Sequence, residues 1–287
     1  MPSRTAIVSF LLSLTVFVVA AASLRADGCS TLFLWRPGTC EGVDLSKPLE
    51  TDRPDFTETP TTVGQGVLQV EGGYTFTYDR EGGTRTTDHS FPETLFRLGM
   101  FADWFELRLD WNYEVQRTST DGAVDDESGA NDLNIGCKIA LTPQDEMLPE
   151  TGVILEMTVP SGGDDFTADR VLPGINYCFG WELNDKWSLY CSTAFGGEAD
   201  DVTNDPFTQF AQSFSLGHEF NDKVRGYTEY YVLSPIGADT NPAQNYIDGG
   251  FTVLINKDVQ WDIRAGVGLN EGADDFFTGT GLSIRYY

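Results

Sequence analysis

The sequence has few basic residues, only two histidines and, beyond Ala22, no long apolar run. Its 18 Lys and Arg stand against 44 Asp and Glu, which gives a formal net charge of −26. A field of this sign repels phosphate backbones, so we expect no nucleic-acid partner. Because no later stretch is apolar enough for a transmembrane helix, any membrane span beyond Ala22 must be built from strands.

The first residues have the three parts of a secretory signal peptide, which we assign to residues 1–26. Arg4 supplies the charged start, an apolar run ends at Ala22, and cleavage could follow Ala22 or Ala26. An uncleaved membrane anchor is the alternative, although the run is near the lower length limit for spanning. Cys29 would suit a lipoprotein, but the residues before it form a poor lipidation box. We therefore expect an exported protein.

Apolar and polar residues alternate in segments of the length that a tilted strand needs to cross a bilayer, about 9 to 11 residues. The 30 Gly, 19 Phe, 11 Tyr and 6 Trp also suit many short strands and tight turns. In the clearest segment, from Phe105 to Val115, one face is wholly apolar and the other is charged or polar. We count twelve such segments over residues 66–287.

The connections alternate between short turns and long loops, which is the layout of outer-membrane barrels. Three short turns are near repeats: Asn-Asp-Lys after Leu183 and after Phe220, and Asn-Lys-Asp after Ile255. These residue types tolerate left-handed backbone and favour tight hairpins. The long links, which are acidic and glycine-rich, are expected to be extracellular loops at residues 79–90, 117–130, 161–172, 196–206, 235–242 and 270–275.

These patterns predict an all-β fold, a twelve-stranded antiparallel up-and-down transmembrane β-barrel after a non-barrel N-terminal segment. In lipid every backbone amide needs a partner within the protein, so the sheet has to close. The even strand number places both termini on the periplasmic side of a Gram-negative outer membrane, whose lipid is the first expected partner. A soluble β-sandwich would also alternate and is the alternative.

Residues 27–65 lack the alternation and are too polar for a domain, so we assign them to a periplasmic or plug-like segment. They contain Thr51-Asp-Arg-Pro-Asp-Phe56, and Val70-Glu-Gly-Gly-Tyr74 and Val159-Pro-Ser-Gly162 follow in the barrel region. Together these stretches resemble a family of outer-membrane β-barrel transporters associated with the MetA pathway of phenol degradation. The resemblance covers roughly residues 51–287. It implies a channel or transporter for passive passage of small solutes, with aromatic or hydrophobic compounds as candidate cargo.

The polar face of the predicted strands carries more acids than bases. Charges of both signs either form ladders that fill the lumen or line a narrow path that favours cations and neutral solutes. Asp52, Arg53 and Asp55 are candidates for a plug that pairs with these charges, and a solvated periplasmic leader is the alternative. The predicted pore-lining residues are Glu71, Glu93, Arg97, Glu106, Arg108, Asp110, Glu114, Asp132, Lys138, Glu156, Glu182, Arg225, Glu229, Asp248, Asp262, Arg264 and Arg285.

Cysteine and histidine give little chemistry to build on. Cys29 and Cys40 flank a short loop in an oxidising compartment and are candidates for a disulfide. The acidic loops could bind divalent cations, but none has the spacing of a calcium loop, and we predict no metal or cofactor site. No motif places a serine beside His218, so we expect no enzyme. An outer-membrane lipid hydrolase and a structural or adhesive barrel without transport are the alternatives to a channel.

Overall fold

The computed structural model describes residues 28–36, 40–200 and 202–287. The signal peptide assigned to residues 1–26 lies outside this range. None of the described residues belongs to a helix long and apolar enough to cross a membrane.

The described chain is all-β and forms fifteen strand segments in one antiparallel sheet. They are β1 (Leu68–Glu81), β2 (Thr84–Ser90), β3 (Thr94–Gly99), β4 (Phe105–Trp111), β5 (Tyr113–Thr120), β6 (Ala123–Ala130), β7 (Leu133–Thr142), β8 (Glu150–Val159), β9 (Leu172–Asn184), β10 (Trp187–Ala199), β11 (Pro206–Asn221), β12 (Val224–Ile236), β13 (Gln244–Asn256), β14 (Val259–Gly268) and β15 (Phe276–Tyr286).

The sheet closes on itself as a barrel, because β15 pairs with β1 from Leu68↔Tyr286 to Tyr78↔Phe276. The closed ring runs β1, β3, β4, β7, β8, β9, β10, β11, β12, β13, β14, β15, which is twelve strands. β2, β5 and β6 continue the lines of β3, β4 and β7 beyond short interruptions. The predicted twelve-stranded antiparallel barrel is therefore confirmed, and the strands that lie second to fourth in it are each broken once.

The barrel is apolar outside and polar inside, the reverse of a soluble protein. On β13, Ile247 and Phe251 are 41% and 50% exposed, whereas Asp248 between them is 5% exposed. On β14, Trp261 and Ile263 are 40% exposed on either side of Asp262, which is fully buried. Water would not tolerate so continuous an apolar surface, but lipid matches it. The protein is an outer-membrane barrel, and the soluble sandwich is excluded.

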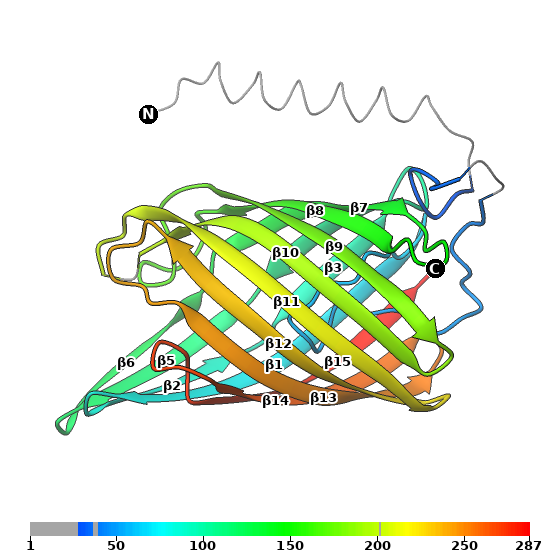
Figure 1. Ribbon diagram of the computed structural model, residues 1–287. Coiled ribbons are helices and arrows are strands. Elements are labelled where there is room, and N and C mark those ends of the chain that lie inside the picture. The colour runs from blue at the N-terminus through cyan, green and yellow to red at the C-terminus, as the bar shows by residue number, and fades with distance from the viewer. Residues whose placement is uncertain (1–27, 37–39, 201) are drawn as a thin grey trace, which may run out of the picture.

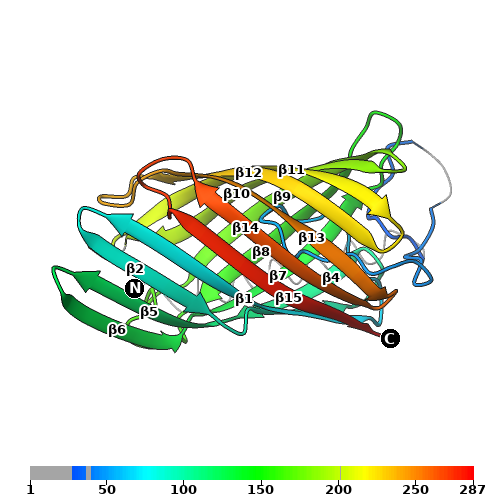
Figure 2. The same cartoon turned by 90° about the horizontal axis from the view of Figure 1, so that it is seen from below.

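Two of the predicted loops are wrong. Residues 79–90 and 117–130 form the hairpins β1–β2 and β5–β6, which project beyond the closed barrel as a small sheet (Figure 2). The reason is local. Threonine-rich runs favour strands, and the turns Gly82-Gly83 and Asp121-Gly122 have positive φ at both residues, as a two-residue hairpin turn requires.

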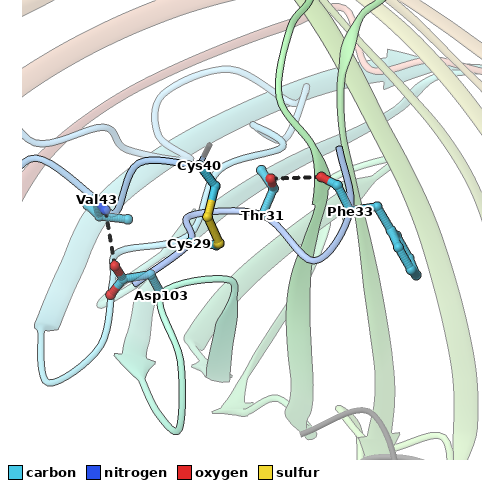
Figure 3. The surroundings of a disulfide bond; sticks show 6 residues. All are labelled: Cys29, Thr31, Phe33, Cys40, Val43 and Asp103. Atoms are coloured by element: carbon cyan, nitrogen blue, oxygen red, sulfur yellow. Dashed lines mark hydrogen bonds between the residues drawn. A yellow bond between two sulfur atoms is a disulfide. The ribbon is translucent and has the colours of Figure 1, made fainter. Parts of the chain in front are cut away.

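The N-terminal segment docks at the end of the barrel that carries the short turns. Figure 1 shows this segment in blue at the end where the C-terminus also lies. Leu32 N donates to Ala140 O (2.9 Å), and Leu49 N donates to Lys257 O (2.8 Å). Cys29 and Cys40 form a disulfide bond there (Figure 3).

Candidate functional site

Residues 50–63, here called the crossing segment, run through the barrel lumen without forming a strand. Backbone N–H groups outside a sheet still need acceptors when they are buried. The acceptors are buried glutamates of the wall: Glu71 on β1 for Asp52 and Arg53, Glu229 on β12 for Phe56 and Thr57, and Glu106 on β4 for Val63. The wall thus supplies the hydrogen bonds that a neighbouring strand would otherwise provide.

Asp52 is the main anchor of the crossing segment on one side of the lumen. Lys138 Nζ on β7 lies 2.8 and 2.7 Å from its two carboxylate oxygens, Arg97 Nη1 on β3 lies 3.2 Å away, and Arg108 Nη1 on β4 donates to the same group. All four side chains are at most 8% exposed. Burial alone would destabilise the charge of Asp52, but Arg97, Lys138 and Arg108 surround it with opposite charge.

Further acids complete this charged cluster. Arg97 also pairs with Glu106 (2.8 Å) and Glu71 (3.0 Å), and Arg108 also pairs with Glu58 of the crossing segment (3.0 Å). Three bases therefore face four acids: Arg97, Arg108 and Lys138 against Asp52, Glu58, Glu71 and Glu106. Buried charges are stable only when each is paired and hydrogen-bonded. Two of the acids belong to the crossing segment, so the wall bases depend on its presence.

The other end of the crossing segment docks on β10, β11 and β12. Thr57 Oγ1 donates to Ser213 Oγ (2.7 Å), and Ser215 Oγ donates to Asp55 Oδ2 (2.9 Å). Phe56 stacks on Tyr231 at 4.5 Å between ring centroids. Around the ring, β4 and β12 are six strands apart in either direction. The chain between Asp52 and Thr57 therefore bridges opposite walls of the barrel.

The crossing segment lies between two cavities. One, of about 440 Å³, is lined by residues of the docked N-terminus together with Pro60, Val63 and Glu150. The other, of about 350 Å³, is lined by Asp52, Arg53 and wall residues nearer the loops such as Asp110. Both are within the usual size range of small-molecule sites, about 300 to 1,000 Å³. The segment thus lies between a cavity at the short-turn end of the barrel and a cavity that faces the long loops.

Most of the predicted site residues lie against the crossing segment or at a rim of the barrel. Asp52, Arg53 and Asp55 all contact the wall, and Arg53 pairs with Glu93 (2.8 Å) and Asp262 (3.5 Å). Arg264 donates to Pro54 O (2.9 Å). At the short-turn rim, Arg285 pairs with Asp258, Arg225 pairs with Glu219, and Glu182 accepts from Tyr190 Oη.

Several predicted residues lie apart from the crossing segment. Glu156 accepts from Asn134 Nδ2, Glu114 accepts from Asn131 Nδ2, and Asp248 accepts from Tyr227 Oη. Asp132 is committed elsewhere: its carboxylate accepts the N–H groups of Ser161, Gly162 and Ala168 and so holds the β8–β9 loop. Asp132 lies in the interruption between β6 and β7, close to loop N–H groups that have no strand partner. These N–H groups need an acceptor, which explains why its carboxylate binds the loop and not the crossing segment.

The sequence analysis missed the aromatic side chains on the inner face, because it listed only charged residues for that face. Tyr231, Tyr246 and Phe277 share the inward parity of Glu229, Asp248 and Gly279. That parity was the available signal, since a residue two positions from an inward acid points the same way. Glu58 was also missed, although it lies only two residues after the conspicuous run from Thr51 to Phe56.

Two observations concern the metal site and the lipid hydrolase that the sequence analysis considered. Among the described residues, no three His, Cys, Asp or Glu side chains come together in a way that could hold a metal ion. His218 packs between Trp187 (4.2 Å) and Phe220 (4.8 Å), and within the described chain its Nδ1 has no hydrogen-bond partner.

Comparison with known proteins places these features in context. The chain is similar to the beta domain of the Bordetella autotransporter BrkA (TM-score 0.50, 10% identity, 77% of this chain and 99% of that one). It is also similar to the NanC porin (0.46, 10%, 76% and 98%) and to the KdgM porin in complex with disordered oligogalacturonate (0.44, 8%, 77% and 99%). Identities this low speak to the fold alone. No curated protein matches the chain. A family model described as "Putative MetA-pathway of phenol degradation" matches residues 51–286.

Proposed function

Because this chain belongs to the family described as "Putative MetA-pathway of phenol degradation", we propose that it is an outer-membrane channel for passive passage of small solutes. In this proposal the crossing segment is the gate, which lies between the two cavities and must shift for solutes to pass. The observation that supports this most is the bridge from Asp52 to Thr57, because it spans opposite walls and separates two cavities.

The contacts of this bridge favour a gate, which can leave the lumen, over a permanent filling of the lumen. A filled lumen is usually packed by wall side chains themselves. Here the space is occupied by one connected stretch that is anchored to the wall mainly by hydrogen bonds, ion pairs and a ring stack. Such contacts exchange with water far more readily than an interdigitated apolar core. The segment can therefore leave without unfolding the barrel, whose own backbone pairing does not depend on it.

The charges of the loop-side cavity favour neutral solutes and cations over anions. Five carboxylates line it against three bases: Asp52, Asp55, Glu58, Glu93 and Asp110 against Arg53, Arg108 and Arg264. A lining with net negative charge raises the local concentration of cations and repels anions. The family description and the aromatic rings on the inner wall support aromatic or hydrophobic compounds as the cargo.

Planar lipid bilayers test this proposal directly. The full mature chain should give discrete openings, and a salt gradient should produce a reversal potential of the sign for cation preference. Glu93→Gln combined with Asp110→Asn should reduce that preference, because both carboxylates line the loop-side cavity. Asp125→Asn is the matched control, since Asp125 is exposed on β6 in the projecting sheet. Bilayers that stay silent, or a preference that the control shifts equally, would contradict the proposal.

A second candidate function is an adhesive barrel without transport. The observation in its favour is the projecting sheet, whose strand β6 carries Asp125, Asp126 and Glu127 and pairs only with β5 among the described strands. Silent bilayers, together with attachment of cells or surfaces that is lost when residues 84–90 and 113–130 are shortened, would favour this alternative.

A further inference from the structure

Four aromatic rings form a continuous stack from the crossing segment towards the β14–β15 loop. Phe56 lies on Tyr231 (4.5 Å, interplanar angle 9°), and Tyr231 lies on Tyr246 (4.8 Å, 21°). Tyr246 meets the edge of Phe277 (6.0 Å, 71°). Tyr246 and Phe277 are 3% and 6% exposed, with Leu233 packed against them. The polar lumen therefore contains one apolar, ring-lined strip of wall.

The strip requires glycine on β14. A Cβ added to Gly266 would lie 2.3 Å from Cζ of Phe277, so any larger residue would push this ring out of its place. The rings thus occupy space that the neighbouring strand leaves free. Offset and edge-to-face arrangements of this kind are those that aromatic rings prefer.

Phe56 differs from the other three rings, because it belongs to the crossing segment and is 36% exposed. Its backbone N–H and that of Thr57 donate to Glu229, two residues before Tyr231 on the same face of β12. The stack and these two bonds together form the β12 attachment of the crossing segment. A competitor for the Tyr231 ring face would therefore remove part of what holds the segment closed.

We propose that the face of Tyr231 covered by Phe56 is a binding site for a neutral aromatic solute, and that a ring bound there displaces Phe56 and releases the crossing segment from β12. The inference rests on the proposed channel function and adds its ligand site and its trigger. The solute ring takes over the stack that Phe56 makes, so Phe56 acts as a built-in competitor.

The surrounding groups define the class of solute. Glu229 and Asp248 are buried acids on the same wall, and they disfavour an anionic ligand. Asp248 is 5% exposed, and its Oδ1 has no hydrogen-bond partner within the described chain. A ring that carries a hydroxyl or another hydrogen-bond donor would satisfy this acceptor. Phenol is the smallest probe that combines an aromatic face with such a donor.

The test is the affinity for phenol, measured by isothermal titration calorimetry on the full mature chain folded in detergent. Phe56→Ala should bind phenol about 2- to 10-fold more tightly than wild type, because an aromatic stack no longer competes. Phe56→Trp should bind phenol more weakly than wild type. The phenol affinity of Tyr231→Leu should be at least about 2- to 10-fold lower than that of wild type. Phe251→Ala, on the lipid face, is the control for loss of a ring and should leave the affinity unchanged. Cyclohexanol, which lacks the aromatic face, should bind wild type more weakly than phenol.

Retained heat-dependent gel mobility shows that each variant has folded. Equal phenol affinity in wild type, Phe56→Ala and Phe56→Trp would overturn the inference, whatever happens with Tyr231→Leu.

Conductance separates this inference from the proposed function. Phenol should increase the open time of wild type but not that of Tyr231→Leu. An open time that does not change with phenol would contradict the inference and leave the proposed channel function standing. Phenol binding that follows the predicted order in a barrel that never conducts would support the site and contradict the channel.

Discussion

Replacement of Asp52 by asparagine removes one charge and almost no volume, and it should open the channel. Asp52 is 2% exposed at its side chain and contacts Lys138, Arg97 and Arg108 at once. Its backbone N–H, which donates to Glu71, is unchanged by the substitution. The variant therefore loses the ion pairs of Asp52, keeps the ion pair between Glu58 and Arg108, and keeps the geometry of the chain.

The magnitude follows from the burial of the partners. Removal of one member of a buried ion pair costs about 3 to 5 kcal/mol. The lower figure applies here, because Glu71, Glu106 and Glu58 still compensate the three bases. This cost applies only while the crossing segment is docked, since water reaches the bases once it leaves. At about 1.4 kcal/mol per tenfold change, 3 kcal/mol shifts the ratio of closed to open channel by roughly 100-fold.

Single-channel recording in planar bilayers measures this ratio. Asp52→Asn should spend a far larger fraction of time open than wild type, at equal open-channel conductance. Asp44→Asn is the matched control, because Asp44 lies in the same N-terminal segment but is exposed and caps a local turn at Ser46. The reasoning is refuted if Asp52→Asn and Asp44→Asn have the same open fraction in folded, heat-modifiable protein.

Three further predictions concern the barrel and its surroundings. Phe251→Arg places a charge on the lipid face and should destabilise the barrel in bilayers. Near the bilayer midplane the free energy of unfolding, measured by denaturant titration, should fall by about 2 to 4 kcal/mol. An unchanged free energy of unfolding would argue against a lipid-facing β13. Asp200 accepts the hydroxyl and the N–H of Thr240, and these bonds hold its pKa below the ordinary value of about 3.9. The contact between the two loops should therefore persist above about pH 4 and be lost as the pH falls through the lowered pKa, seen as a titration of the Thr240 amide shift; a titration above pH 4 would contradict this. Cys29→Ser should speed chymotrypsin cleavage after Phe33, an exposed residue of the loop that the disulfide closes, without a change in the heat-dependent gel mobility of the barrel, whereas unchanged cleavage would show that the disulfide does not restrain this loop.

The barrel could be predicted from the sequence because one physical rule repeats along every strand. Glu106, Arg108 and Asp110 alternate with apolar residues, and the lipid allows only one orientation of such a strand. The three Asn-Asp-Lys-type turns then set which rim is short. The same reasoning failed for residues 79–90 and 117–130, where the polar strands β2 and β6 carry no apolar face and therefore looked like loops.

The path of the crossing segment could not be predicted in the same way. Its contacts join residues far apart in the chain, such as Asp52 with Lys138 and Thr57 with Glu229, and no periodic pattern encodes them. The run from Thr51 to Phe56 indicated only that the segment is unusual. The stack of Phe56 on Tyr231 was beyond reach, because it depends on which wall a strandless chain meets.

A reversible lock on the crossing segment tests the central claim most directly. Thr57 and Ser213 are bonded through their hydroxyl groups at 2.7 Å, so Thr57→Cys with Ser213→Cys should form a disulfide that ties the segment to β11. The free cysteines Cys137, Cys178 and Cys191 are replaced by serine in the same chain, and a chain with only those replacements controls for the effect of reductant on Cys29–Cys40. The account predicts a silent channel when the lock is oxidised and conductance that returns on reduction. Equal conductance in both states would contradict it.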